Sequence, residues 1–127
     1  MSKQEFPQPT DGELDVLRFL WGNGPSTVKQ VHEVINQKKP VKYTTTLKVM
    51  QVMLERGLLL RDDSKYRHIY TPALPEERTQ RQLLTDFLDK AFSGSAEKLV
   101  MQLLSAKKLS AKERETIIKM FDENERK

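Results

Sequence analysis

The stretch from Lys38 to Lys48 carries the side chains in this sequence that are best suited to binding chemistry. It holds four lysines and no acidic residue, and residues 43–46 (Tyr-Thr-Thr-Thr) lie between the third and fourth lysines. Ammonium groups bind anions, and threonine hydroxyls donate and accept hydrogen bonds while the threonine methyls make apolar contacts. Such a set suits a DNA groove, where the phosphates are anionic and the base edges offer hydrogen-bonding and apolar groups.

A helix would present these side chains in a fixed order. Apolar residues recur at i, i+3 and i+7 over residues 43–57 and predict a helix there, with Thr44 as its N-cap and Gly57 as its stop. The apolar stripe consists of Leu47, Met50 and Leu54. The opposite face carries a single charge and consists of Thr45, Lys48, Val49 and Val52. A buried helix in a plain bundle is the alternative that the periodicity leaves open.

Two further helices are expected ahead of this one. The first starts at a capping-box pattern, Thr10 with Glu13, and stops at residues 22–25, which contain Gly and Pro. The second starts at residues 26–27 and cannot continue through Pro40, so a short lysine-rich linker joins it to the third helix. Short helices joined in this way match a helix-turn-helix outline.

A β-hairpin is expected after the third helix. Residues 58–61 and 66–71 read as two strands around a polar turn, and Ile69 is expected to pack on the helices. Lys65 and Arg67 then stand at the tip, where they can contact phosphate. A solvated hairpin tip is the alternative interpretation of these charges.

The remainder, residues 75–127, predicts three short amphipathic helices, separate from a first domain at residues 1–74. Three such helices cannot close a substantial core alone, so we expect them to pair with a second copy of the chain. The residues expected at that interface are Leu84, Phe87, Leu88, Phe92, Leu99, Val100, Leu103, Leu104, Ile117 and Phe121.

Composition limits the partners. The chain has 127 residues and a net charge of +4, and residues 1–74 hold eleven Lys and Arg against eight Asp and Glu, which favours a polyanionic partner. Cysteine is absent, which excludes disulfides and thiolate metal sites, and no cofactor is expected.

No apolar run approaches the ~20 residues that cross a membrane, so we expect a cytoplasmic protein without a membrane partner. Residues 1–9 hold two prolines and are expected to form a loose arm.

Catalysis finds little support in the sequence. The two histidines, His32 and His68, have no serine and acid spaced with them as a nucleophilic triad requires. Carboxylates alternate with Lys and Arg, which is typical of a solvated surface, and no Gly-rich phosphate loop or metal-ligand spacing occurs. We therefore do not expect an enzyme.

The order and spacing of these motifs resemble the penicillinase-repressor family of the BlaI/MecI/CopY type, over nearly the whole chain. The resemblance implies a mainly α fold with a small hairpin: a winged helix-turn-helix followed by a three-helix dimerisation segment. It also implies a homodimeric transcriptional repressor of a palindromic DNA operator. A winged-helix module that binds another protein, without DNA, is the alternative. The segments that carry the resemblance are residues 14–21, 27–31, 43–47, 53–59, 66–72 and 97–100.

Within this reading, the first turns of the third helix enter the major groove of DNA. The residues expected to meet base edges are Thr45, Thr46, Lys48 and Val49. Those expected to hold phosphate are Lys42, Tyr43 and Thr44 at the helix entrance and Lys65 and Arg67 in the wing.

Regulation is where the sequence departs from the family. Copper-responsive members carry a paired-cysteine motif, which this chain lacks. Resistance-linked members are inactivated by cleavage of an Asn-Phe bond, and the corresponding pair here is Ser95-Ala96. This departure argues against release by that protease route. A regulatory protease stays an unproven partner of the resemblance, and the inducer, the operator sequence and the regulated genes are left open.

Overall fold

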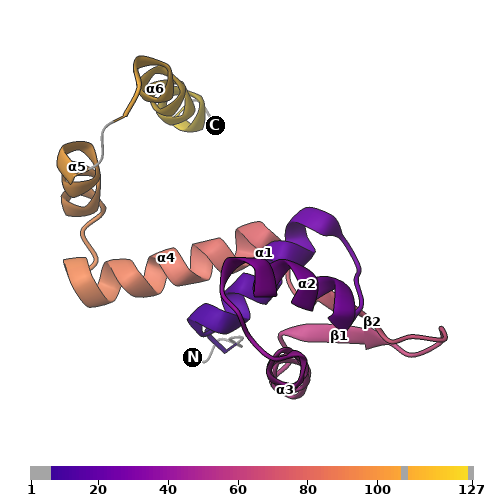
Figure 1. Ribbon diagram of the computed structural model, residues 1–127. Coiled ribbons are helices and arrows are strands. Elements are labelled where there is room, and N and C mark those ends of the chain that lie inside the picture. The colour runs from indigo at the N-terminus through magenta and orange to yellow at the C-terminus, as the bar shows by residue number, and fades with distance from the viewer. Residues whose placement is uncertain (1–6, 107–108, 126–127) are drawn as a thin grey trace. The chain divides into compact units, whose positions relative to one another are not determined.

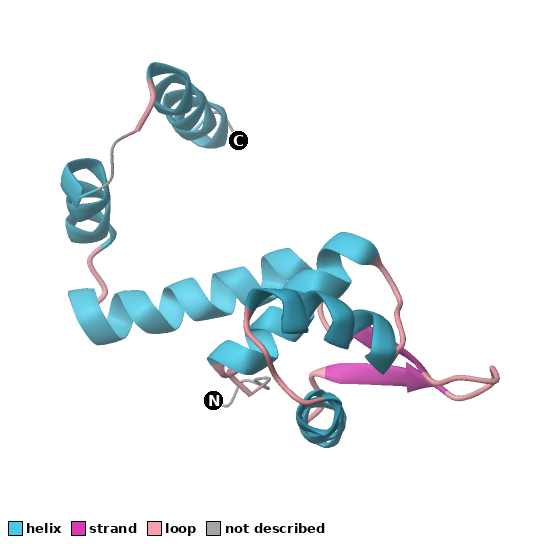
Figure 2. Ribbon diagram, viewed as in Figure 1, coloured by secondary structure: helices cyan, strands magenta, loops and turns pink. Residues whose placement is uncertain are grey.

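The computed structural model describes residues 7–106 and 109–125, so residues 1–6 of the expected arm lie outside it. The described residues form six helices and two strands, in the order α1-α2-α3-β1-β2-α4-α5-α6 (Figures 1 and 2). The chain divides into two compact units, residues 1–83 and residues 84–127. The domain boundary between residues 74 and 75 stays a prediction. No helix in the described part of the chain is long and apolar enough to cross a membrane.

Helix α1 (Asp11–Asn23) begins at the predicted capping box. The Oγ1 atom of Thr10 accepts a hydrogen bond from the backbone N–H of Glu13 at 3.2 Å, and the Glu13 carboxylate accepts one from the Thr10 N–H at 3.0 Å. Two of the amides left unpaired at the helix start are thereby satisfied. The helix ends at Gly24, whose φ of 96° suits a residue without a Cβ.

Helix α2 (Val28–Lys38) begins at a second capping box, between Thr27 and Gln30. The linker that follows is held by the side chain of Asn36, whose Oδ1 accepts a hydrogen bond from the Val41 N–H at 2.9 Å. Pro40 lies in this linker, as predicted, and the chain turns there into the next helix.

Helix α3 (Tyr43–Glu55) matches the predicted third helix except at its start. The N-cap is Lys42 and not Thr44, and no side chain caps the first amides. At the other end Gly57 has a φ of 83°, and its N–H donates to the Leu54 carbonyl while the Leu58 N–H donates to the Met53 carbonyl. These two bonds form a Schellman motif, so the predicted stop at Gly57 is confirmed.

The core of the first unit lies where α1, α2 and α3 pack against one another and against the strands. On α3 the buried stripe consists of Thr46, Met50 and Met53. The predicted stripe was therefore rotated about the helix axis relative to the observed one. Leu47 and Leu54 are only partly buried at the border of the core. The buried apolar residues are Val16, Leu17, Leu20, Val28, Val31, Met50, Met53, Leu58, Leu59 and Tyr70. This core fixes the orientation of α3.

Strands β1 (Leu59–Asp62) and β2 (Ile69–Pro72) pair antiparallel and form the predicted hairpin, with a longer tip at residues 63–68. The expectation that Ile69 packs on the helices was wrong, since Tyr70 is the buried residue at 2% exposure. Tyr70 also bridges to a distant segment: it exchanges backbone hydrogen bonds of 2.8 and 3.1 Å with Ser26, and its side chain belongs to the core that α1 and α2 share. Arg61 pairs with Tyr70 across the hairpin.

The division between the two units falls within α4 (Glu76–Phe92), and α5 (Ala96–Ala106) and α6 (Ala111–Glu125) follow. The break at residues 93–95 is confirmed, with Gly94 at a φ of 79°. The predicted capping box of Ser110 with Glu113 is confirmed by hydrogen bonds of 3.0 and 3.1 Å. The fold is thus the expected winged helix-turn-helix followed by helices.

Candidate nucleic-acid interface

The exposed strip of α3 is the centre of the candidate interface. Thr44, Lys48 and Gln51 follow one another at steps of four and three residues, so they share one face of the helix, and all three are exposed. Tyr43 and Thr45 flank this strip and are exposed as well. An ammonium, an amide and several hydroxyls therefore stand side by side, and these groups match the donors and acceptors of base edges.

Two residues that we predicted on this face are turned toward the other helices. The side chain of Thr46 is buried at 3% exposure, and its Oγ1 lies 2.9 Å from the Nδ1 of His32 on α2. Val49 is half-buried against the core. The burial of Thr46 is incompatible with its predicted contact to bases. Gln51 was missed, although its spacing of three residues from Lys48 was a usable signal.

The first turns of α2 and α3 differ electrostatically from those of the other helices. They are the two among the six helices in the described ranges whose first turns hold no acidic residue. Lys29 lies in the first turn of α2, and Lys42 is the N-cap of α3. Because a helix N-terminus carries partial positive charge, a lysine there is unfavourable unless an anion is bound. The two helix starts are therefore suited to phosphate.

The acids of the hairpin have local partners, and its cations Lys65 and Arg67 are exposed. Asp62 accepts hydrogen bonds from the hydroxyl of Ser64 at 2.6 Å and from the Ser64 N–H at 2.9 Å, which lower the pKa of its carboxyl. The Asp63 carboxylate pairs with Arg61 of β1, with N to O distances of 2.7 and 3.2 Å. Lys65 and Arg67 are both exposed, as predicted.

A recess of about 380 Å³ brings the wing, the start of α2 and the start of α3 together. Arg67 from the wing and Tyr43 from α3, both predicted site residues, line it together with Thr27 and Lys29 of α2. Sequence reasoning missed Thr27 and Lys29, although the lysine in an acid-free first turn was a signal. The recess is lined by Thr27, Val28, Lys29, Tyr43, Leu47, Tyr66, Arg67, His68 and Tyr70.

Comparison with protein families gives a match over most of the chain. The model of the family described as penicillinase repressor matches residues 9–123. The transcriptional regulator BlaI of Mycobacterium tuberculosis is 32% identical over 82 residues, which are 64% of this chain and 59% of that protein. The penicillinase repressor of Bacillus licheniformis is 20% identical over 121 residues, 95% of this chain and 94% of that protein. These are names of regulators and not of enzymes.

Comparison with solved structures agrees on the fold of the first unit. The solution structure of the DNA binding domain of the repressor BlaI matches with a TM-score of 0.51 at 20% identity. The match covers 58% of this chain and 90% of that chain. At this identity the similarity establishes the winged-helix fold alone.

Proposed function

The chain belongs to the penicillinase repressor family, and we propose that it is a homodimeric transcriptional repressor that binds a palindromic DNA operator. The observation that carries the proposal is the exposed strip of α3, which lies beside a recess shared with the wing and with the start of α2. A helix that reads bases needs such flanking groups, because phosphate contacts fix its register in the groove.

Within the proposed complex, α3 enters the major groove and Thr45, Lys48 and Gln51 meet base edges. The Lys48 ammonium suits the O6 and N7 acceptors of guanine, the Gln51 amide suits adenine, and the Thr45 methyl suits thymine. Glu55, one turn further along the strip, is exposed and acidic. Its negative charge repels phosphate, so the contacts of α3 with DNA are expected to end before Glu55.

Phosphate is held at the start of α3 and in the adjoining recess. Lys42, Tyr43 and Thr44 lie at the α3 entrance, where uncapped amides add to the attraction for an anion. Lys29 at the start of α2 and Arg67 in the wing line the recess with Tyr43, so the phosphates of one DNA strand can lie along the recess. Lys65 extends the same positive surface toward the hairpin tip.

We propose that the second unit forms the dimer interface, because many of its apolar side chains are exposed to solvent in a single chain. Leu84, Phe87, Leu104 and Phe121 are each more than half exposed. Large apolar side chains exposed on successive helices are characteristic of a protein interface. Two-fold pairing would place two α3 helices on half-sites about one duplex turn, or a multiple, apart.

The proposal is tested by selecting a preferred duplex from a random library and measuring its affinity by fluorescence anisotropy at several salt concentrations. Lys48→Ala is expected to cost about 1–3 kcal/mol on the selected duplex and to relax the preference at one base pair. Lys42→Ala is expected to weaken selected and random duplexes alike and to lower the salt slope by about one. Lys119→Ala, in α6, is the matched control.

The alternative, a winged-helix module that binds another protein, predicts a different result. Such a module would show little affinity for random duplex at low salt and no steep salt dependence. Equal effects of Lys48→Ala and Lys42→Ala on selected and random duplexes would contradict the division into base-reading and phosphate-holding residues.

A further inference from the structure

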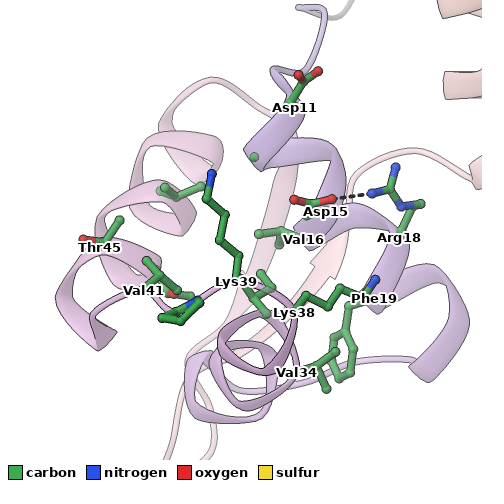
Figure 3. A pocket seen from close by; sticks show the side chains of 15 residues that line it. Asp11, Asp15, Val16, Arg18, Phe19, Val34, Lys38, Lys39, Val41 and Thr45 are labelled. Carbon is green, nitrogen blue, oxygen red and sulfur yellow. Dashed lines mark hydrogen bonds and ion pairs between the residues drawn. The ribbon is translucent and has the colours of Figure 1, made fainter.

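A cavity of about 560 Å³ lies between α1, the end of α2 and the first half of α3 (Figure 3). Its walls are mainly apolar and come from three helices: Val16 and Phe19 of α1, Val34 and Ile35 of α2, and Val49 of α3. The volume is in the range of small-molecule sites, about 300–1,000 Å³. The walls favour a ligand with an apolar body.

The charged groups at this cavity leave a positive excess. Asp15 pairs with Arg18, drawn as a dashed line in Figure 3, whereas no ion pair engages Lys38 or Lys39 within the described residues. Figure 3 shows the side chains of Lys38 and Lys39 extending in different directions, with Lys38 toward Phe19. Among the described residues Asp11 has no ion pair either, so two lysines stand against one such acid in the lining, and an anionic group on the ligand is favoured.

The same cavity reaches the start of α3. Thr45, Thr46 and Val49 of α3 line it, and so do Pro40 and Val41 of the linker between α2 and α3. A ligand in the cavity therefore touches the segment that sets where α3 begins. Its negative charge would also lower the positive potential beside the proposed phosphate contacts.

We propose that this cavity is a binding site for a small carboxylate with an apolar chain or ring, held by Lys38 and Lys39. Occupancy weakens the binding of DNA, and DNA weakens the binding of the carboxylate by the same factor. The proposed carboxylate site does not depend on the DNA-binding function proposed above. Only its coupling to DNA binding rests on that function.

The site is tested by titrating the full-length ¹⁵N-labelled protein with decanoate and following its amide resonances by NMR. The largest shifts are expected at Val34, Ile35 and Val41, and decylammonium, the matched cation, is expected to produce none there. Replacing both lysines, Lys38→Gln with Lys39→Gln, should weaken decanoate binding about fivefold, since an exposed ion pair contributes modestly to binding. Both side chains are exposed, so this variant keeps its fold.

A second variant, Val34→Trp, fills the cavity and should abolish the shifts. Equal binding of decylammonium, or decanoate shifts confined to residues 84–127, would overturn the site. Unchanged decanoate affinity in the double lysine variant would overturn the assignment of the lysines.

The coupling is tested by measuring the affinity for a random duplex at low salt, with and without saturating decanoate. At least about a fivefold loss of affinity is expected, and none in the Val34→Trp variant. An unchanged affinity in the wild type would overturn the coupling while the NMR result stands. Absence of duplex binding without decanoate would instead contradict the proposed DNA-binding function, so the two failures are distinguishable.

Discussion

The Nδ1 atom of His32 lies 2.9 Å from the Oγ1 atom of Thr46, and this hydrogen bond joins the middle of α2 to the first turn of α3. The His32 ring also meets the ring of Tyr43 edge-on, with centroids 5.4 Å apart. One histidine therefore contacts a buried and an exposed residue of the α3 start. His32 holds the helix entrance in place rather than acting as a base.

Replacing His32 by leucine should lower the free energy of unfolding by about 1–3 kcal/mol, because the Thr46 hydroxyl is buried and would lose its partner. Urea unfolding measures this cost. In a double-mutant cycle, Thr46→Val should recover part of the loss in the His32→Leu background. Strict additivity of the two single variants would show that the bond contributes nothing.

Glu13 should make stability depend on pH in the acid range. Burial alone would raise the pKa of its carboxyl, but hydrogen bonds from Arg56 and from Thr10 outweigh burial and hold the pKa below its ordinary value of 4.5. A lowered folded-state pKa stabilises the fold at pH values above 4.5, and this stabilisation is lost as the pH falls through the folded-state pKa.

The variant Glu13→Gln removes this titration. Relative to it, the wild type should be more stable by about 1.5–3 kcal/mol at pH 7, the range for a hydrogen bond to a charged group. Chemical unfolding at a series of pH values should show the difference shrinking below pH 4.5. A difference that stays constant down to pH 2 would contradict the lowered pKa.

The wing should add affinity without sequence preference. Arg67→Ala and Lys65→Ala should each lower the slope of log affinity against log salt by about one, since each residue is proposed to contact one phosphate. Arg67, which lines the recess with Tyr43, is expected to have the larger effect on affinity. Anisotropy titrations with selected and random duplexes measure both quantities. A change in preferred sequence caused by either variant would assign the wing to base reading instead.

Dimerisation should depend on the apolar surface of the second unit. Phe121→Asp places a charge where an apolar contact is proposed and should weaken self-association by about 2 kcal/mol or more. Sedimentation equilibrium measures the effect, and Lys119→Ser on the same helix is the control. If the wild type sediments as a monomer at all concentrations, the proposed dimer is wrong.

Local features of this fold are present in the sequence. The capping boxes of Thr10 with Glu13 and of Ser110 with Glu113 form between residues three positions apart, and the stop at Gly57 needs only a residue that tolerates positive φ. Helical periodicity placed the third helix to within about two residues. The order of these elements was enough to identify the fold and the family resemblance.

Features that depend on long-range contacts were decided only by the tertiary structure. Tyr70 is buried among core residues of other elements and bridges to Ser26, 44 residues away, and the ion pair of Glu13 with Arg56 joins residues 43 positions apart. Thr46 lies on the buried stripe of α3, and its hydroxyl has its hydrogen-bond partner, His32, on another helix. A periodic pattern shows that a helix has two faces, but the direction of the buried face depends on packing against other helices, which spacing along one chain does not encode.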